Sequence, residues 1–252
     1  MKIYVAYVKR MLYSYLFWIS IFGIGLITYL GLTEETPRTL VSSFNVMLDL
    51  SSYRKLMMLF AVLPFGMNYC REWNHKFTSF IMARISTTKH LLSYILMQFF
   101  SSFTVTFIGI ILGMLILLFK VPIYIDEGTA YSEGIYSLLS HNKAVIFLIL
   151  RTFIYSVSIA TWSMAGLAMS ALFLNSYIAV ISPLVFSYGL ELITIESSFL
   201  PNLWYLSLSY TDFSGDPIIS TLYILSIFLM ISSIFALIFF GIAKRRAQNE
   251  IH

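Results

Sequence analysis

Long apolar stretches separated by short polar ones dominate this chain. Irregular backbone cannot face lipid, and the stretches lack the alternation of about ten residues that is typical of transmembrane β-strands. The pattern therefore predicts an all-α integral membrane protein with six transmembrane helices, each long enough or nearly so to cross about 30 Å of hydrocarbon. The six stretches are residues 16–32, 56–70, 91–119, 144–174, 177–195 and 218–243, of which the second is short and recruits residues 51–55.

The polar segment REWNHKFTSFIMARISTTKH, residues 71–90, separates the second stretch from the third. Its charges place it in water, and its apolar residues recur with helical spacing. One side of the helix is expected to carry Trp73, Phe77, Phe80, Ile81 and Arg84, and the other Glu72, His75, Ser79 and Met82. The spacing predicts an amphipathic helix at the membrane surface, followed by Ser86, Thr87 and Thr88 as caps of the next helix.

Composition excludes a soluble globular protein. Apolar residues make up 59% of the chain, aromatic residues 17% and charged residues only 11%, with a mean hydropathy of +0.83. Cys70 is the single cysteine, which excludes a disulfide within the chain.

The distribution of lysine and arginine predicts that both termini are cytoplasmic, because cytoplasmic loops are enriched in these residues. With this orientation ten basic residues face the cytoplasm and six lie toward the other side. The ten are Lys2, Lys9, Arg10, Arg71, Lys76, Arg84, Lys89, Lys244, Arg245 and Arg246. The six are Arg38, Arg54, Lys55, Lys120, Lys143 and Arg151. The first span resembles a signal peptide in its basic flank but no small-residue cleavage site follows, so we expect a retained helix.

Residues 1–15 carry an apolar helical stripe opposite basic residues, which predicts an interfacial helix beneath anionic head groups. An extension of the first span into the cytoplasm is the alternative. In the first outer loop, residues 33–55, a weaker amphipathic pattern favours a segment lying on the membrane. A half-helix at the membrane interface is expected within residues 196–217.

Several residues predict how the helices bend and pack. Pro64 and Pro183 interrupt the second and fifth spans and should kink them. Gly109 and Gly113 form a GxxxG pair that allows another helix to approach closely. Small residues line the fourth span, which is therefore expected in the interior of the bundle.

The chain lacks recognisable catalytic chemistry. It has no phosphate-binding loop, no G-x-S-x-G elbow and no histidine or cysteine spacing that would hold a metal, so we expect no enzyme and no bound cofactor. Arg151 and Glu191 are ionisable residues within apolar spans, where buried charge marks a functional site by default. They either pair or line a polar path, or else Arg151 reaches the head groups and Glu191 lies near the interface.

The arrangement resembles the permease subunits of type-2 ATP-binding-cassette (ABC) exporters. The likeness lies in the interfacial N-terminal helix, the six spans with both ends inside, and the amphipathic loop after the second span. Locally it is strongest in PFGMNYCREWNHKFTSFIMARISTTKHLLSYIL, residues 64–96, and SALFLNSYIAVISPLVF, residues 170–186. The chain would then be a single permease domain, residues 1–252, without a nucleotide-binding domain.

The resemblance implies that residues 71–88 form a coupling loop that contacts a separate ATPase. Trp73, Phe77 and Phe80 would be its apolar anchors, with Arg71, Glu72, Lys76 and Arg84 as polar contacts. Such a complex contains two permeases, identical or related, and two ATPase subunits that bind ATP and Mg²⁺, in a bacterial cytoplasmic membrane. Membrane lipids are further partners, and no nucleic acid is expected.

The small, aromatic-rich interior favours an amphipathic cargo, with peptide export or immunity first and drug or lipid-linked glycan export second. An ATPase-independent channel or secondary carrier is the alternative from another class. That alternative predicts ionisable residues near the membrane midplane.

Overall fold

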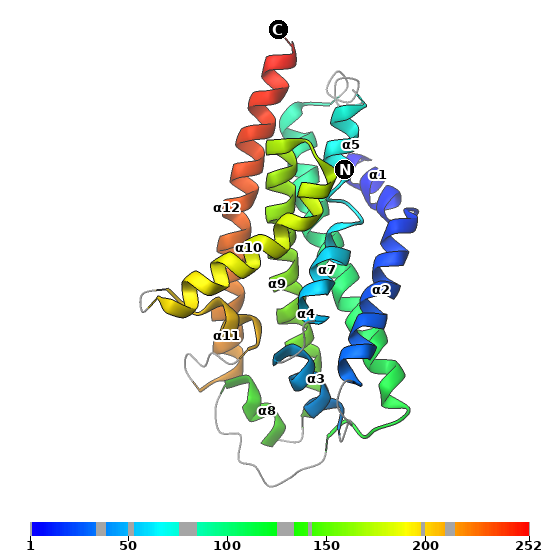
Figure 1. Ribbon diagram of the computed structural model, residues 1–252, viewed down its shortest axis with the longest axis vertical. Helices are drawn as coiled ribbons and strands as arrows, with labels where there is room; N and C mark the ends of the chain where they lie inside the picture. The colour runs from blue at the N-terminus through cyan, green and yellow to red at the C-terminus, as the bar shows by residue number, and fades with distance from the viewer. Residues whose placement is uncertain are drawn as a thin grey trace.

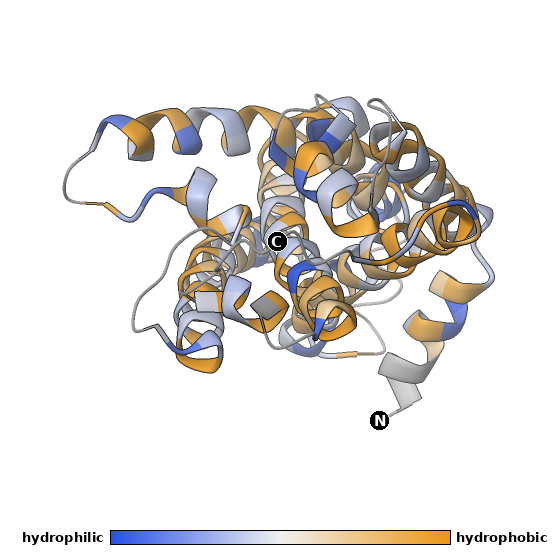
Figure 2. Cartoon of the chain, turned by 90° about the horizontal axis from the view of Figure 1, so that it is seen from below, coloured by the Kyte–Doolittle hydropathy of each residue, from blue (hydrophilic) through white to orange (hydrophobic). Residues whose placement is uncertain are grey.

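The computed structural model describes residues 2–33, 39–49, 53–75, 85–124, 134–140, 143–197, 200–209 and 215–251, and these residues form helices and connecting turns without a β-strand. Among the described residues, five helices are long and apolar enough to cross a membrane. They are α2 (Tyr15–Leu32), α7 (Thr87–Leu118), α9 (Ala144–Phe173), α10 (Ser176–Glu196) and α12 (Pro217–Ile251). Hydrophobic positions dominate these helices in the view from below (Figure 2), as expected of a multi-pass membrane protein.

Shorter helices complete the two ends of the bundle (Figure 1). α1 (Lys2–Leu12), α5 (Asn68–Asn74) and the end of α12 lie toward one end. α3 (Leu40–Asp49), α8 (Ser137–Ser140) and α11 (Leu203–Ser207) lie toward the other. Both termini are therefore at the same end of the molecule.

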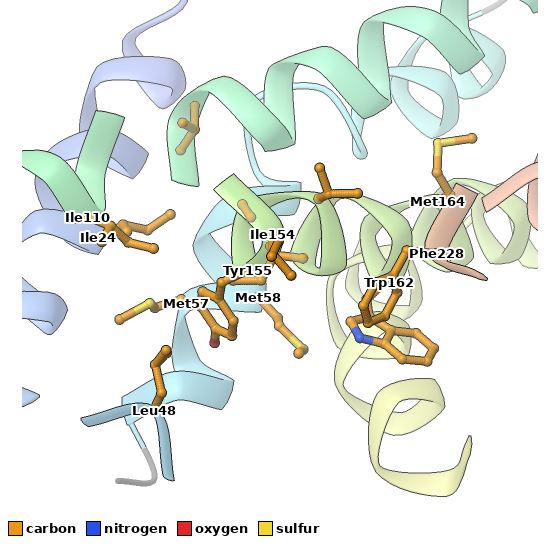
Figure 3. Close-up of a cluster of buried hydrophobic side chains, with 14 of the residues drawn as sticks. Ile24, Leu48, Met57, Met58, Ile110, Ile154, Tyr155, Trp162, Met164 and Phe228 are labelled. Atoms are coloured by element: carbon orange, nitrogen blue, oxygen red, sulfur yellow. The ribbon is translucent and has the colours of Figure 1, made fainter. Parts of the chain in front are cut away.

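Helix α9 is the centre of the bundle. It packs against α4 (Tyr53–Val62), α7, α10 and α12, and most of its residues are buried. Figure 3 shows Tyr155, Trp162 and Met164 of α9 among apolar side chains from the neighbouring helices. The small residues of α9 are all buried, as the sequence predicts for the interior helix: Ser156, Ser158, Ala160, Ser163, Ala165, Gly166, Ala168, Ser170 and Ala171.

The predicted second span, residues 56–70, is not one continuous helix. Helix α4 ends at Val62, a turn covers residues 63–67, and α5 begins at Asn68. Pro64 lies in this turn, where its ring and its missing N–H oppose continuation of the helix. Pro183, in contrast, lies inside α10, which runs through it as a single helix.

The N-terminal helix is separate from the first span. A break at Tyr13 and Ser14 lies between α1 and α2, so the alternative of one extended helix is wrong. Tyr7 and Met11 of α1 are buried, and α1 packs against α7. Part of the apolar stripe of this helix, at Tyr7 and Met11, thus contacts protein, while Val8 is exposed.

Glycines allow α2 and α7 to approach closely, which confirms the packing role predicted for the GxxxG pair. A Cβ atom at Gly109 would lie 2.7 Å from a side-chain carbon of Ile24. One at Gly113 would lie 2.8 Å from the carbonyl oxygen of Gly25. Both distances are shorter than van der Waals contact, so a larger residue would push the two helices apart.

The first outer loop contains a short helix whose apolar side is covered by protein. Its helix, α3, packs against α2, α4 and α7. Leu40, Phe44, Met47 and Leu48, the apolar side of its amphipathic pattern, are all buried. Within the segment 196–217, where a half-helix is expected, the described residues include the short helix α11, which packs against α9 and α10.

Candidate functional site

Three groups of buried ionisable side chains tie the helices together. Two lie toward the end of the molecule that carries α3 and α11, and one lies toward the end that carries α1 and α5. Burial of a charge is costly unless it is paired, so each group is either a structural tie or a functional site.

The first group, which we call the Arg54 cluster, consists of Arg54, Lys55 and Glu191. Lys55 donates hydrogen bonds to Oε2 of Glu191 at 2.6 Å and to the hydroxyl of Ser187 at 3.2 Å. A guanidinium nitrogen of Arg54 lies 3.7 Å from the same carboxylate oxygen. Two positive charges thus share one carboxylate, and all three residues are at most 5% exposed.

Aromatic rings cover the cations of the Arg54 cluster. The Arg54 guanidinium lies 3.8 Å from the ring centre of Trp204, which belongs to α11, and the Lys55 ammonium lies 4.5 Å from that of Tyr188. The hydroxyl of Tyr155 donates to the carbonyl oxygen of Arg54 at 2.9 Å. The rings attract the cations electrostatically. The guanidinium carbon of Arg54 lies over the ring of Trp204, and the terminal N–H groups, which point outward in the guanidinium plane, find no hydrogen-bond acceptor in that ring.

Arg151 forms the second group. Its side chain is fully buried and donates to Oδ1 of Asn45, and one of its nitrogens lies 3.5 Å from Oδ1 of Asp49. The rings of Phe44, Tyr136 and Phe147 surround it, with centres 5.4–5.8 Å from the guanidinium carbon. Arg151 therefore ties α9 to α3.

The two ionisable residues singled out from the sequence thus belong to different groups. Glu191 bridges to Arg54 and Lys55, and Arg151 bridges to Asp49. Arg151 does not reach the head groups along the surface, because it is 0% exposed, and Glu191 is only 3% exposed. Both side chains are buried, and each is held by a partner within the protein.

The third group joins α1 to α5 and α7. Arg10 of α1 donates to Oε1 of Glu72 in α5, and Glu72 is 4% exposed. The hydroxyl of Tyr7 shares a hydrogen bond of 2.8 Å with Nδ1 of His90. Burial and the nearby carboxylate of Glu72 raise the pKa of Tyr7 well above its ordinary value, so its hydroxyl stays protonated.

This geometry corrects the role expected for Glu72. The sequence pattern places it on the polar side of a surface helix as a contact for a partner, but its carboxylate is buried against Arg10. Trp73 is half-buried and packs on Tyr69, with ring centres 5.8 Å apart. Arg71, Asn74 and His75 are exposed beside them. Lys76, Phe77, Phe80 and Arg84 lie outside the described residues.

The exposed end of α5 lies beside the turn between α9 and α10. The side-chain amide of Asn74 donates to the carbonyl oxygen of Leu174 at 3.3 Å, and Arg246 of α12 donates to that of Leu172 at 2.7 Å. Leu174 adopts a left-handed conformation and Asn175 caps α10, as expected of a tight turn. One end of the bundle therefore brings together α5, this turn and α12.

Ser86 is the N-cap of α7, the helix whose start the sequence places at residues 86–88, although its side chain makes no capping hydrogen bond. Within the described residues no three histidine, cysteine, aspartate or glutamate side chains gather in a way that could hold a metal ion.

Sequence reasoning missed that Arg54 and Lys55 are buried. Both were assigned to the flank of a polar loop, where basic residues are usually solvated. The signal that could have identified them is their helical position, because α4 is buried at Arg54, Lys55, Met57 and Met58 on successive turns.

Comparisons with known proteins find no significant similarity: no family model, no curated protein and no solved structure matches this chain.

Proposed function

We propose that this chain is the transmembrane subunit of an ATP-driven exporter of the type-2 ABC kind, with six membrane crossings and both termini in the cytoplasm. The sixth crossing is α4 and α5 taken together, which run from the end with α3 to the end with α1 (Figure 1). The observation that carries the proposal is the position of α5: a charged segment follows a broken crossing and presents Arg71 and His75 at the end that holds both termini.

The connections of α5 support a coupling role. Through Glu72 and Arg10 it is bonded to α1, and through Asn74 it is bonded to the turn between α9 and α10. A push on α5 from a partner would therefore reach two other parts of the bundle, α1 and this turn, through direct contacts. Aromatic residues and arginine are effective anchors when a partner covers them, which fits Trp73 and Arg71.

The partners follow from what the chain lacks. It has no phosphate-binding loop, so ATP and Mg²⁺ would be bound by two copies of a separate ATPase. One such chain supplies half of a translocation path, which requires a second permease, identical or related, in a bacterial cytoplasmic membrane. The proposed cargo is an amphipathic molecule, a peptide first and a drug or a lipid-linked glycan second.

Co-purification tests this proposal. The chain is isolated in mild detergent from its native cell, and a stoichiometric soluble subunit with a phosphate-binding loop is the expected result. Arg71→Glu should reduce recovery of that subunit, while Lys89→Glu, at another exposed residue near the same end, should not. A chain that purifies without an ATPase contradicts the proposal.

A channel or secondary carrier without an ATPase is the second candidate. It is favoured by the buried ionisable residues within helices, since such residues often line ion or substrate paths. Solute movement through liposomes that contain only this chain, without ATP, would support it.

A further inference from the structure

The Arg54 cluster carries more positive charge than its own residues neutralise. Arg54 and Lys55 face one carboxylate, that of Glu191, which leaves a net charge of +1 in a site that is nearly closed to solvent. An excess buried charge is costly, and it is reduced when an ion of the opposite sign binds.

The cluster also has N–H donors that lack hydrogen-bond acceptors. Within the described part of the chain, neither terminal guanidinium nitrogen of Arg54 has a hydrogen-bond partner, although the side chain is only 3% exposed. Buried polar groups are rarely left without partners, and each such group requires an explanation. A guanidinium presents parallel N–H donors, which match the two oxygens of a phosphate or a carboxylate.

The cluster lies near the C-terminal end of α10. Glu191 lies five residues before the end of α10 at Glu196, which is about 7.5 Å along a helix. The polar layer on each side of a bilayer is about 5–7 Å thick. In a bilayer that α10 crosses, this end of the helix would lie close to the layer of lipid phosphates.

An apolar stripe on α10 leads to the cluster. Its members are spaced three or four residues apart, lie on one side of the helix, and are between 44% and 80% exposed. They are Tyr177, Ile181, Val185, Tyr188, Leu192 and Ile195. Tyr188 belongs to both features, because its ring also contacts the Lys55 ammonium.

We propose that the Arg54 cluster binds the phosphate of an anionic lipid whose acyl chain lies along this stripe of α10. The phosphate accepts hydrogen bonds from the guanidinium of Arg54 and adds a negative charge beside Lys55. The site is independent of any ATPase, so the inference goes beyond the exporter function and does not depend on it.

The test measures binding of two lipids with the same acyl chains to the purified full-length chain in a nonionic detergent. The probes are dioctanoyl phosphatidylglycerol, which is anionic, and dioctanoyl phosphatidylcholine, which is zwitterionic, with inorganic phosphate as a third probe. Native mass spectrometry reports the bound lipid and the oligomeric state together, and thermal unfolding reports stabilisation. Saturating phosphatidylglycerol should raise Tm by about 5 °C, and phosphatidylcholine should not.

Two variants should change the affinity for phosphatidylglycerol in opposite directions. Arg54→Gln removes the hydrogen-bond donors and should weaken binding about tenfold. Glu191→Gln removes the competing carboxylate, which raises the net charge of the cluster, and should strengthen binding. Lys120→Gln is the matched control, because Lys120 is an exposed cation that lies outside the cluster. If Arg54→Gln does not fold, Arg54→Lys decides, because it keeps the buried charge but lacks the parallel donors of the guanidinium and should also weaken binding.

Several results would overturn the proposal. One is equal stabilisation by the two lipids. Another is an affinity for phosphatidylglycerol that Glu191→Gln leaves unchanged or weakens. A third is a dimer of this chain that does not bind phosphatidylglycerol, which would mean that a second copy covers the stripe. Equal binding of inorganic phosphate and phosphatidylglycerol would show that the α10 stripe contributes nothing, and would overturn the assignment of a lipid.

Discussion

The ammonium of Lys55 lies 2.6 Å from a carboxylate oxygen of Glu191, and this contact joins α4 to α10 across 136 positions of sequence. Both side chains are buried, and Arg54 adds a second cation 3.7 Å from the same oxygen. The pair therefore holds together two segments that are remote in the chain, in a place where each charge alone would be costly.

Replacing Glu191 with glutamine should destabilise the chain in detergent without added lipid. The substitution leaves Lys55 and Arg54 buried without their carboxylate, and removal of one partner from a buried ion pair costs about 3–5 kcal/mol. Thermal unfolding, followed by tryptophan fluorescence, measures the effect. Glu196→Gln is the control, because Glu196 is exposed at the end of the same helix. Equal unfolding temperatures for the two variants would contradict a structural role of the pair.

The closest approach of two helices gives a second prediction. A Cβ atom at Gly113 would lie 2.8 Å from the Gly25 carbonyl oxygen and 2.7 Å from Cβ of Thr28. Gly113→Ala should therefore cost about 1–3 kcal/mol through overpacking between α2 and α7.

Gly241 provides the matched control for this substitution, since it lies in α12 with no atom within 4 Å of an added Cβ. Gly241→Ala should leave stability unchanged or raise it by up to about 1 kcal/mol, because alanine favours the helix. Both variants are compared by thermal unfolding. If Gly113→Ala is as stable as Gly241→Ala, the helices α2 and α7 are farther apart at Gly113 than the structure shows.

Patterns along the chain are sufficient to predict much of the helical architecture. The burial of the small residues on α9 and the close packing at Gly109 and Gly113 follow from residue size at helical spacing, which is a local property. The turn at Pro64 follows from the chemistry of one residue. Residue size and spacing along the chain are sufficient to predict packing wherever the neighbouring surface is apolar.

The charged ties could not be predicted in this way, because each depends on a partner far along the chain. Glu72 has the spacing of an exposed residue, yet Arg10, 62 positions away, lies beside it and allows its burial. Lys55 and Arg54 resemble the basic flank of a loop until α10 supplies Glu191. A basic residue at the end of an apolar stretch has the same sequence pattern whether it is solvated or paired.

Arg10→Ala should loosen the N-terminal helix. The substitution removes the cation that neutralises the buried carboxylate of Glu72, so the attachment of α1 to α5 weakens. Amide hydrogen exchange in α1 should become about tenfold faster. Lys9→Ala is the control, because Lys9 is the neighbouring exposed cation on the same helix. If the two variants exchange at the same rate, the Arg10–Glu72 contact does not hold α1 in place.

Arg151→Met should release α3 from the bundle while leaving the long helices intact. Methionine fills a similar volume within the rings of Phe44 and Phe147, and the Asp49 side chain is 23% exposed, so loss of Arg151 does not leave a fully buried carboxylate and the cost to global stability should be small. The hydrogen bond to Asn45 and the contact with Asp49 are lost, however, and these two residues anchor α3 to α9. Amide exchange should therefore accelerate in residues 40–49 with little change in Tm.

Lys143→Met is the matched control for Arg151→Met, since Lys143 is an exposed cation at the start of the same helix. It should leave exchange in α3 unchanged. Arg151→Lys separates charge from geometry, because an ammonium cannot donate in parallel to Asn45 and Asp49 as a guanidinium does. Faster amide exchange of α3 in this variant as well would show that the planar guanidinium of Arg151, and not its charge alone, holds α3. Full protection of α3 in Arg151→Met would show instead that the apolar contacts of Phe44 and Met47 hold this helix without any charge.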